Sequence, residues 1–85
     1  MLALKTKEIT LEYFASIAEK TEKPNEVYKT NAKTISQLWD EIQGIYEFEH
    51  NKAFLRAAIN HRFCEWDSSF ENQDSVAFIP PVSGG

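Results

Sequence analysis

The chain has 85 residues and a net charge of −4 at pH 7, and its 42% hydrophobic and 26% charged residues are typical of one folded domain. The nine Lys and Arg residues are dispersed, which argues against nucleic acid as a partner, and no apolar run reaches the roughly 20 residues that cross a membrane. The single cysteine, Cys64, excludes an internal disulfide and a cysteine-only zinc site, and the charged N-terminal residues predict a cytoplasmic protein.

The segment 8–14 alternates along its length in the manner of a half-buried strand. Ile9, Leu11 and Tyr13 share the face that we expect in the core. Phe14 has the opposite phase, so its side chain is expected to point away from the core.

Residues 15–21 permit a short helix, which the turn around Pro24 should end. Residues 26–30 then predict a second strand in which Val27 points inward. The simplest arrangement is a hairpin-like pair of strands joined through the short helix.

The main helix is expected to begin at Thr34, because Thr34 and Gln37 have the spacing of a capping box. Apolar residues then recur at intervals of three and four, as on one face of an amphipathic helix. This face consists of Ile35, Leu38, Trp39, Ile42, Ile45 and Tyr46. Such spacing predicts packing on a sheet rather than a cofactor site. Residues 47–53 are polar and predict a loop.

Three further strands are expected, at residues 55–59, 62–66 and 76–79. Asn60 and His61 between the first two predict a tight hairpin turn, since Asn tolerates positive φ. Phe63 and Ile79 have the phase that points away from the core, as Phe14 does. Three exposed apolar side chains indicate a docking surface, although a further helix or loop could also cover them.

The last strand leads into two prolines and a small-residue end. Proline fixes φ and donates no backbone hydrogen bond, so the prolines should stop the sheet and direct the chain outward. We therefore divide the chain into a domain at 1–79 and a tail at 80–85. The tail consists of Pro80, Pro81, Val82, Ser83, Gly84 and Gly85. Its glycines suit insertion into a narrow partner channel, but a frayed end is the alternative.

The ending Pro80-Pro81-Val82-Ser83-Gly84-Gly85 behind Val76-Ala77-Phe78-Ile79 closely resembles the small, sulfur-carrier subunit of molybdopterin synthase. The segment 57–63 resembles the conserved hairpin of that family, and the likeness spans roughly Ile9 to Gly85. The resemblance implies an α+β, ubiquitin-like β-grasp fold with one main helix on a mixed sheet. Family members commonly have Gly where this chain has Gln73, which leaves that turn open.

The resemblance also implies a function for the end of the chain. An adenylyltransferase would use ATP to activate Gly85, a sulfur donor would convert it to a thiocarboxylate, and the neighbouring Gly84 would keep the tail narrow. The thiocarboxylate would then give its sulfur to cyclic pyranopterin monophosphate on the large subunit, within a heterotetramer. The chain itself would be a non-catalytic carrier that binds no cofactor or metal.

The family's contact with both partners implies roles for seven residues. The expected partner-binding residues are Phe14, Phe63, Ile79, Pro80, Pro81, Val82 and Ser83. Two alternatives remain: a sulfur carrier for thiazole synthesis or thiolation, and a ubiquitin-like protein modifier or interaction module.

Residues with intrinsic reactivity give little support for an active site within the chain itself. His50, His61 and Cys64 lack the paired spacing of a metal site and a carboxylate that would orient a catalytic histidine. Cys64 is expected to act as a small apolar filler in its strand.

Overall fold

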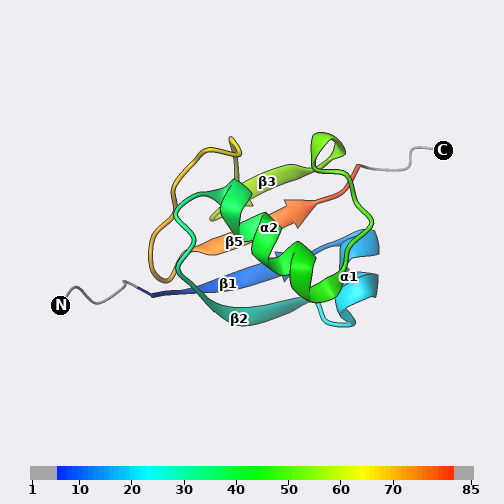
Figure 1. The fold of residues 1–85 in the computed structure, drawn as a ribbon, viewed down its shortest axis with the longest axis horizontal. Helices are drawn as coiled ribbons and strands as arrows, with labels where there is room; N and C mark the ends of the chain where they lie inside the picture. Colours follow the sequence, from blue (N-terminus) through cyan, green and yellow to red (C-terminus); the bar gives the residue numbers. More distant parts are fainter. Residues whose placement is uncertain (1–5, 82–85) are drawn as a thin grey trace.

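The computed structural model describes residues 6–81, which form a five-stranded sheet with a helix lying across one face (Figure 1). In chain order the elements are β1 (Lys7–Tyr13), α1 (Ala15–Thr21), β2 (Asn25–Thr30), α2 (Ile35–Tyr46), the 3-10 helix η1 (Lys52–Phe54), β3 (Arg56–Ile59), β4 (Arg62–Cys64) and β5 (Ser75–Ile79). The expected α+β class, mixed sheet and main helix are confirmed. None of the helices among residues 6–81 has the length and apolar character needed to cross a membrane.

The strands lie in the order β2-β1-β5-β3-β4, so the last strand in the chain occupies the centre of the sheet. In Figure 1 the orange β5 lies between the blue β1 and the yellow-green β3. β5 pairs with β1 in parallel and with β3 antiparallel, while β1–β2 and β3–β4 are antiparallel pairs. The position of β5 brings the tail out of the middle of the sheet rather than from an edge.

Helix α2 begins as the sequence predicts and supplies much of the core. The Thr34 hydroxyl oxygen accepts a hydrogen bond from the Gln37 backbone N–H at 3.2 Å, while the Gln37 side chain reaches back to the Lys33 N–H at 2.8 Å. Trp39 is buried, with its ring 5.1 Å from the ring centres of both Phe48 and Phe78. The expected burial of Trp39 is confirmed.

Two apolar positions near the end of α2 differ from the sequence prediction. Ile45 was expected in the core but is 58% exposed, whereas Phe48, in the expected polar loop, is 3% exposed. The helix ends at Tyr46 and Glu47 adopts a left-handed conformation with φ of 55°. This reversal carries Phe48 back under the helix, where it stacks on Trp39 and occupies the space that Ile45 does not reach.

The inward direction predicted for Val27 is wrong, because its side chain is 66% exposed. The alternate residues of β2 face the helix instead. The hydroxyl groups of Tyr28 and Thr30 both donate hydrogen bonds to Glu41 of α2, at 2.9 and 2.7 Å. In this edge strand the polar contacts to the helix, rather than the one aliphatic residue, set which face turns inward.

β4 is shorter than the expected strand at 62–66, because the chain turns soon after Cys64. The Glu65 backbone N–H donates to the Ser68 hydroxyl oxygen and the Ser68 N–H donates to the Glu65 carbonyl, both at 3.1 Å. These two bonds close a turn that ends the pairing with β3. The tight hairpin turn expected before β4 is confirmed by positive φ values at Asn60 and His61.

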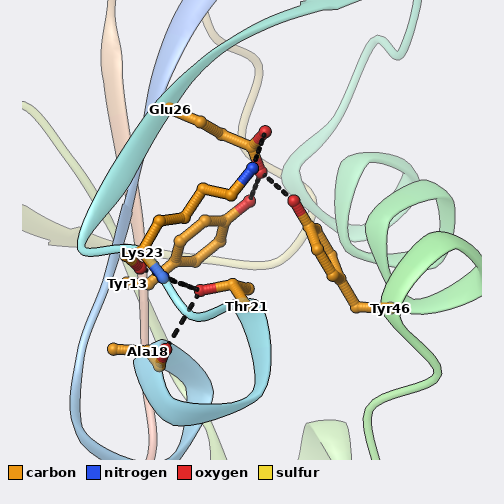
Figure 2. Close-up of polar contacts among 6 residues, drawn as sticks. All are labelled: Tyr13, Ala18, Thr21, Lys23, Glu26 and Tyr46. Atoms are coloured by element: carbon orange, nitrogen blue, oxygen red, sulfur yellow. Dashed lines mark hydrogen bonds and ion pairs between the residues drawn. The ribbon is translucent and has the colours of Figure 1, made fainter.

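A polar cluster ties the first hairpin to α2. Figure 2 shows Tyr13, Tyr46 and Lys23 converging on the Glu26 carboxylate. Both tyrosine hydroxyls donate to Oε2, that of Tyr46 at 2.6 Å, and the Lys23 ammonium lies 3.4 Å from Oε1. Burial acts to raise the pKa of Glu26, but the hydrogen bonds from the two tyrosines and the charge of Lys23 outweigh it and lower the pKa below its ordinary value.

We expect the Glu26→Gln variant to lose about 1–2 kcal/mol of unfolding free energy at pH 7, because its neutral amide accepts the tyrosine hydrogen bonds more weakly. A lowered folded-state pKa means that the contribution is complete above the unfolded pKa, about 4.3, and is lost as pH falls through the folded value. Urea unfolding between pH 7 and pH 3 should therefore show the two curves converging at low pH. The exposed Glu19→Gln serves as the control, and a gap that does not narrow as the pH falls would contradict the assignment.

The turn before β5 places Gln73 in a conformation that favours glycine. Gln73 has φ of 75°, and its backbone N–H donates to the Glu8 carbonyl at 2.7 Å, which fixes the turn against β1. Left-handed geometry costs a residue with a Cβ roughly 1–2 kcal/mol. Glycine avoids this cost, but its greater freedom in the unfolded chain offsets part of the gain in stability. We expect Gln73→Gly to stabilise the fold by about 1 kcal/mol in thermal unfolding. Glu71→Gly, in the same turn without positive φ, should destabilise it.

Candidate functional site

The candidate site begins where β5 leaves the sheet. Pro80 is buried and Pro81 is exposed, so the chain changes from packed to open between two consecutive residues. Strand pairing ends at Ile79, because neither proline can donate to the ladder. The predicted sites Val82, Ser83, Gly84 and Gly85 lie outside the described residues.

An apolar groove of about 840 Å³ adjoins this exit point. One side is formed by Phe14, Ala15 and Ser16 at the start of α1, and the other by Ile79, Pro80 and Pro81. Phe14 is 45% exposed, and Ala15 has φ of 50°, so the backbone bends sharply beside the groove. The structure thus brings two of the predicted docking residues, Phe14 and Ile79, next to the base of the tail.

Phe63 lies on the same face of the sheet but outside the groove. Its ring is 62% exposed, and the Arg56 guanidinium lies 4.0 Å from the ring centre in a cation–π contact. In the register Ala58 lies beside Phe63, and Arg56 lies beside Ile79, so the Arg56 side chain lies between Phe63 and the end of β5. The outward directions predicted for Phe14 and Phe63 are confirmed, while their role in docking stays a prediction.

The structure adds two residues to this face. Val27, which the sequence analysis placed inward, is 66% exposed on the outer strand β2 beside Thr10. Arg56 joins it through its contact with Phe63. Alternation within residues 55–59 places Arg56 on the other face of the strand from Leu55 and Ala57. Its outward direction could therefore have been predicted from the sequence.

The histidines and Cys64 lie apart from one another. His50 Nε2 shares a 2.7 Å hydrogen bond with the Ser16 hydroxyl, while His61 is in the β3–β4 turn. Cys64 packs against the core, and burial raises the pKa of its thiol, which keeps it protonated. Among residues 6–81 no three His, Cys, Asp or Glu side chains come together as a metal site would require.

Comparison with known families decides what kind of domain carries this site. The model of the ThiS family matches residues 11–85, which include the end of β1, the other four strands and the tail. The chain belongs to the ThiS family. Members of this family of β-grasp sulfur carriers share the helix-on-sheet architecture described above, and the resemblance inferred from the tail sequence is confirmed at this level.

Solved structures with the same fold include an archaeal modifier protein and subunits of molybdopterin converting factor. Small archaeal modifier protein 1 from Methanosarcina acetivorans superposes with a TM-score of 0.77 at 17% identity, covering 95% of this ThiS-family chain and 99% of the other. A Pyrococcus furiosus protein assigned as molybdopterin converting factor subunit 1 gives 0.73 at 22% identity, covering 89% and 99%. A chain from the complex of subunits 1 and 2 of molybdopterin-converting factor from Helicobacter pylori gives 0.66 at 19%, covering 92% and 99%. At these identities the likenesses establish the fold.

Proposed function

We propose that this chain is the sulfur-carrier subunit of molybdopterin synthase. The observation that carries the proposal is the sequence Pro80-Pro81-Val82-Ser83-Gly84-Gly85 placed directly after the central strand of a ThiS-family domain. A rigid pair of prolines followed by residues with little or no side chain can reach into a confined site while the domain stays docked outside. The carrier itself would hold no cofactor or metal.

The carboxylate of Gly85 needs activation before it can carry sulfur. In the proposed reaction an adenylyltransferase joins Gly85 to AMP from ATP with release of pyrophosphate, and a sulfur donor then displaces AMP to leave a thiocarboxylate. A thiocarboxylate is a better nucleophile than a carboxylate and is ionised at neutral pH. Bound in the large subunit, its sulfur would attack an electrophilic carbon of cyclic pyranopterin monophosphate to form a thioester. Hydrolysis of the bond between the Gly85 carbonyl and the sulfur would then return Gly85 as a carboxylate, so that each carrier delivers one sulfur toward the dithiolene.

The sheet face around Phe14, Phe63 and Ile79 supports the proposed docking on the large subunit. The exposed rings of Phe14 and Phe63, together with the apolar groove at Phe14, Ile79 and the prolines, would supply the apolar contacts of such an interface. A solved relative of the same fold is one chain of a complex between subunits 1 and 2. In a heterotetramer two such carriers would flank a dimer of large subunits.

We expect Phe63→Asp to weaken binding of the large subunit at least tenfold in calorimetric titration while shifting the melting temperature of the free carrier by only a few degrees. The charge would enter an apolar contact in the complex, whereas in the free chain the side chain is already in water. Ile45→Asp places the same charge on an exposed apolar residue on the opposite side of the molecule and should leave binding unchanged. A collapse of stability in Phe63→Asp would instead assign the residue to the core.

The intact mass of the chain purified from its own cells tests the sulfur-carrier assignment. Replacement of one carboxylate oxygen by sulfur adds ~16 Da. Alkylation of the thiocarboxylate with iodoacetamide should then increase the mass of the modified chain further. A chain recovered only with its unmodified mass under conditions of active cofactor synthesis would contradict the proposal.

A protein modifier is the second candidate, favoured by the fold likeness to small archaeal modifier protein 1. In that case Gly85 would end in an isopeptide bond to a lysine of a target protein. Affinity-tagged chain expressed in its own cells would then appear in covalent adducts of higher mass that resist denaturation, and tryptic peptides would contain branched lysines. The two candidates thus predict different chemical fates for the same carbonyl carbon.

A further inference from the structure

A row of side chains crosses all five strands on the sheet face opposite α2. The strand registers place Asn25 beside Glu12, Glu12 beside Ala77, Ala77 beside Ala58, and Ala58 beside Phe63. Register partners point to the same side of a sheet, and the residues adjacent to Glu12 and Ala77 along their strands are buried on the α2 side. We call these five residues the cross-sheet row.

Glu12 is the one acidic residue of the cross-sheet row, and its carboxylate is incompletely satisfied. Oε1 is buried and accepts no hydrogen bond from any group of residues 6–81. The His61 ring nitrogen Nε2 lies 3.3 Å from Oε1, but the His61 side chain is 76% exposed at the tip of a turn and is charged only when protonated. A carboxylate oxygen withdrawn from water without a partner destabilises the free domain.

The other charges on this face are placed differently. Lys29 lies opposite Glu8 in the β1–β2 register, whereas the neutral Asn25 lies opposite Glu12. Arg56 extends over the ring of Phe63, with the methyl groups of Ala58 and Ala77 between that ring and Glu12 in the row. Within residues 6–81 the face therefore presents one carboxylate without a lysine or arginine opposite it, beside the buried residues Ala77 and Ala58.

From this arrangement we infer that Glu12 receives an arginine or lysine side chain of the molybdopterin synthase large subunit when that subunit covers the sheet. The inference rests on the proposed function, because the covering protein is the partner named there. The Glu12 side chain is 26% exposed, so a cationic side chain of the partner laid along the row would place its charge against the carboxylate. An uncharged surface would leave the carboxylate buried and unpaired, so Glu12 would select for a basic partner surface.

The test compares Glu12→Gln with Glu8→Gln, which removes the same charge from the same strand and face but beside Lys29. The affinity of each full-length carrier for the large subunit from the same organism is measured by calorimetry at low and at high salt. We expect Glu12→Gln to weaken binding at least tenfold at low salt and to flatten the salt dependence, while Glu8→Gln changes affinity less than threefold. Equal effects of the two variants would reduce the role of Glu12 to net charge and overturn the inference.

Two further measurements separate the partner's cation from the alternatives. The free Glu12→Gln carrier should melt at or above the temperature of the parent chain, because Oε1 loses no partner; a lower melting temperature would mean that Glu12 is satisfied within the chain. His61→Ala should leave binding unchanged, and an effect matching that of Glu12→Gln would assign the carboxylate to His61 instead. If Glu12→Gln weakened binding of the adenylyltransferase but not of the large subunit, the assignment to the large subunit would be overturned.

Failure of this inference is distinguishable from failure of the proposed function. If Phe63→Asp abolishes binding of the large subunit while Glu12→Gln has no effect, the docking face stands and the role of Glu12 falls. If neither variant changes binding, the large subunit does not dock on this face, and both the docking proposal and the inference fail. If the large subunit does not bind the parent chain at all, the proposed function fails with them.

Discussion

Deletion of Gly85 is expected to reduce molybdopterin formation by several orders of magnitude without changing the thermal unfolding of the domain. The sheet ends at Ile79 and the prolines interrupt the ladder, so residues beyond Pro81 are not needed for the pairing that holds β5. Removing one residue moves the reacting carbonyl by about 3.3 Å, and a misplacement of ~1 Å already costs about a hundredfold in rate. Gly84→Phe should have a similar effect by preventing entry of the tail into the partner.

The assay is conversion of the pterin precursor by the large subunit with carrier that has been enzymatically thiocarboxylated, and circular dichroism reports folding. Gly44→Ala is the matched control, since Gly44 lies in α2 and an added Cβ there meets no atom within 4 Å. This change should stabilise the helix by up to about 1 kcal/mol and leave sulfur transfer intact. A chain lacking Gly85 that supports the parent rate would refute the sulfur-carrier proposal.

Trp39→Ala is expected to lower the unfolding free energy by about 3–5 kcal/mol, the largest single loss of stability that we predict. Trp39 is 3% exposed and lies between α2 and the sheet, with Phe48 stacked on its ring and Phe78 of β5 beside it. Its removal leaves a cavity that these two aromatic rings cannot both fill. Because a domain of this size has only about 5–15 kcal/mol of net stability, the variant should be partly unfolded at physiological temperature.

Urea unfolding followed by tyrosine fluorescence and circular dichroism measures the change. Ile45→Ala on the same helix is the control, and it should alter stability by no more than a few tenths of a kcal/mol because Ile45 is 58% exposed. If both variants lost the same free energy, the helix would contribute through its intrinsic propensity rather than through burial of Trp39.

The elements with a strong hydrophobic period were predictable from the sequence. In β1, Ile9, Leu11 and Tyr13 alternate without exception, and all three are buried. The capping residues of α2 also determine its start, since Thr34 offers its hydroxyl to the backbone N–H of Gln37. Local sequence is sufficient in both cases, because alternation identifies the face of β1 that meets the core and the capping residues mark the start of α2.

The misassigned residues depend on contacts between segments far apart in the chain. The face that β2 turns inward depends on Glu41, which accepts from Tyr28 and Thr30 across the gap to α2, and nothing local to Val27 indicates it. The burial of Phe48 in place of Ile45 depends on where α2 ends. The left-handed residue at that end is Glu47 rather than the glycine that usually marks the end of a helix.

The candidate site was predictable only in part. The outward phases of Phe14 and Phe63 follow from alternation alone, whereas the contact of Arg56 with Phe63 and the position of Glu12 in the cross-sheet row require the strand order. The register of β1 against β5 joins residues more than sixty positions apart, and no local pattern in the sequence specifies such a pairing.

The central position of β5 also affects when the protein becomes able to work. β5 is the last strand to be synthesised, and without it β1–β2 and β3–β4 are two separate hairpins with unpaired inner edges. Closure of the sheet must wait for contacts between the two ends of the chain, which are slow to form because of the long loop that they close. The cross-sheet row exists only after β5 has inserted between the hairpins. A large subunit that recognised this row would therefore bind only carriers whose folding is complete, and incomplete chains would not dock.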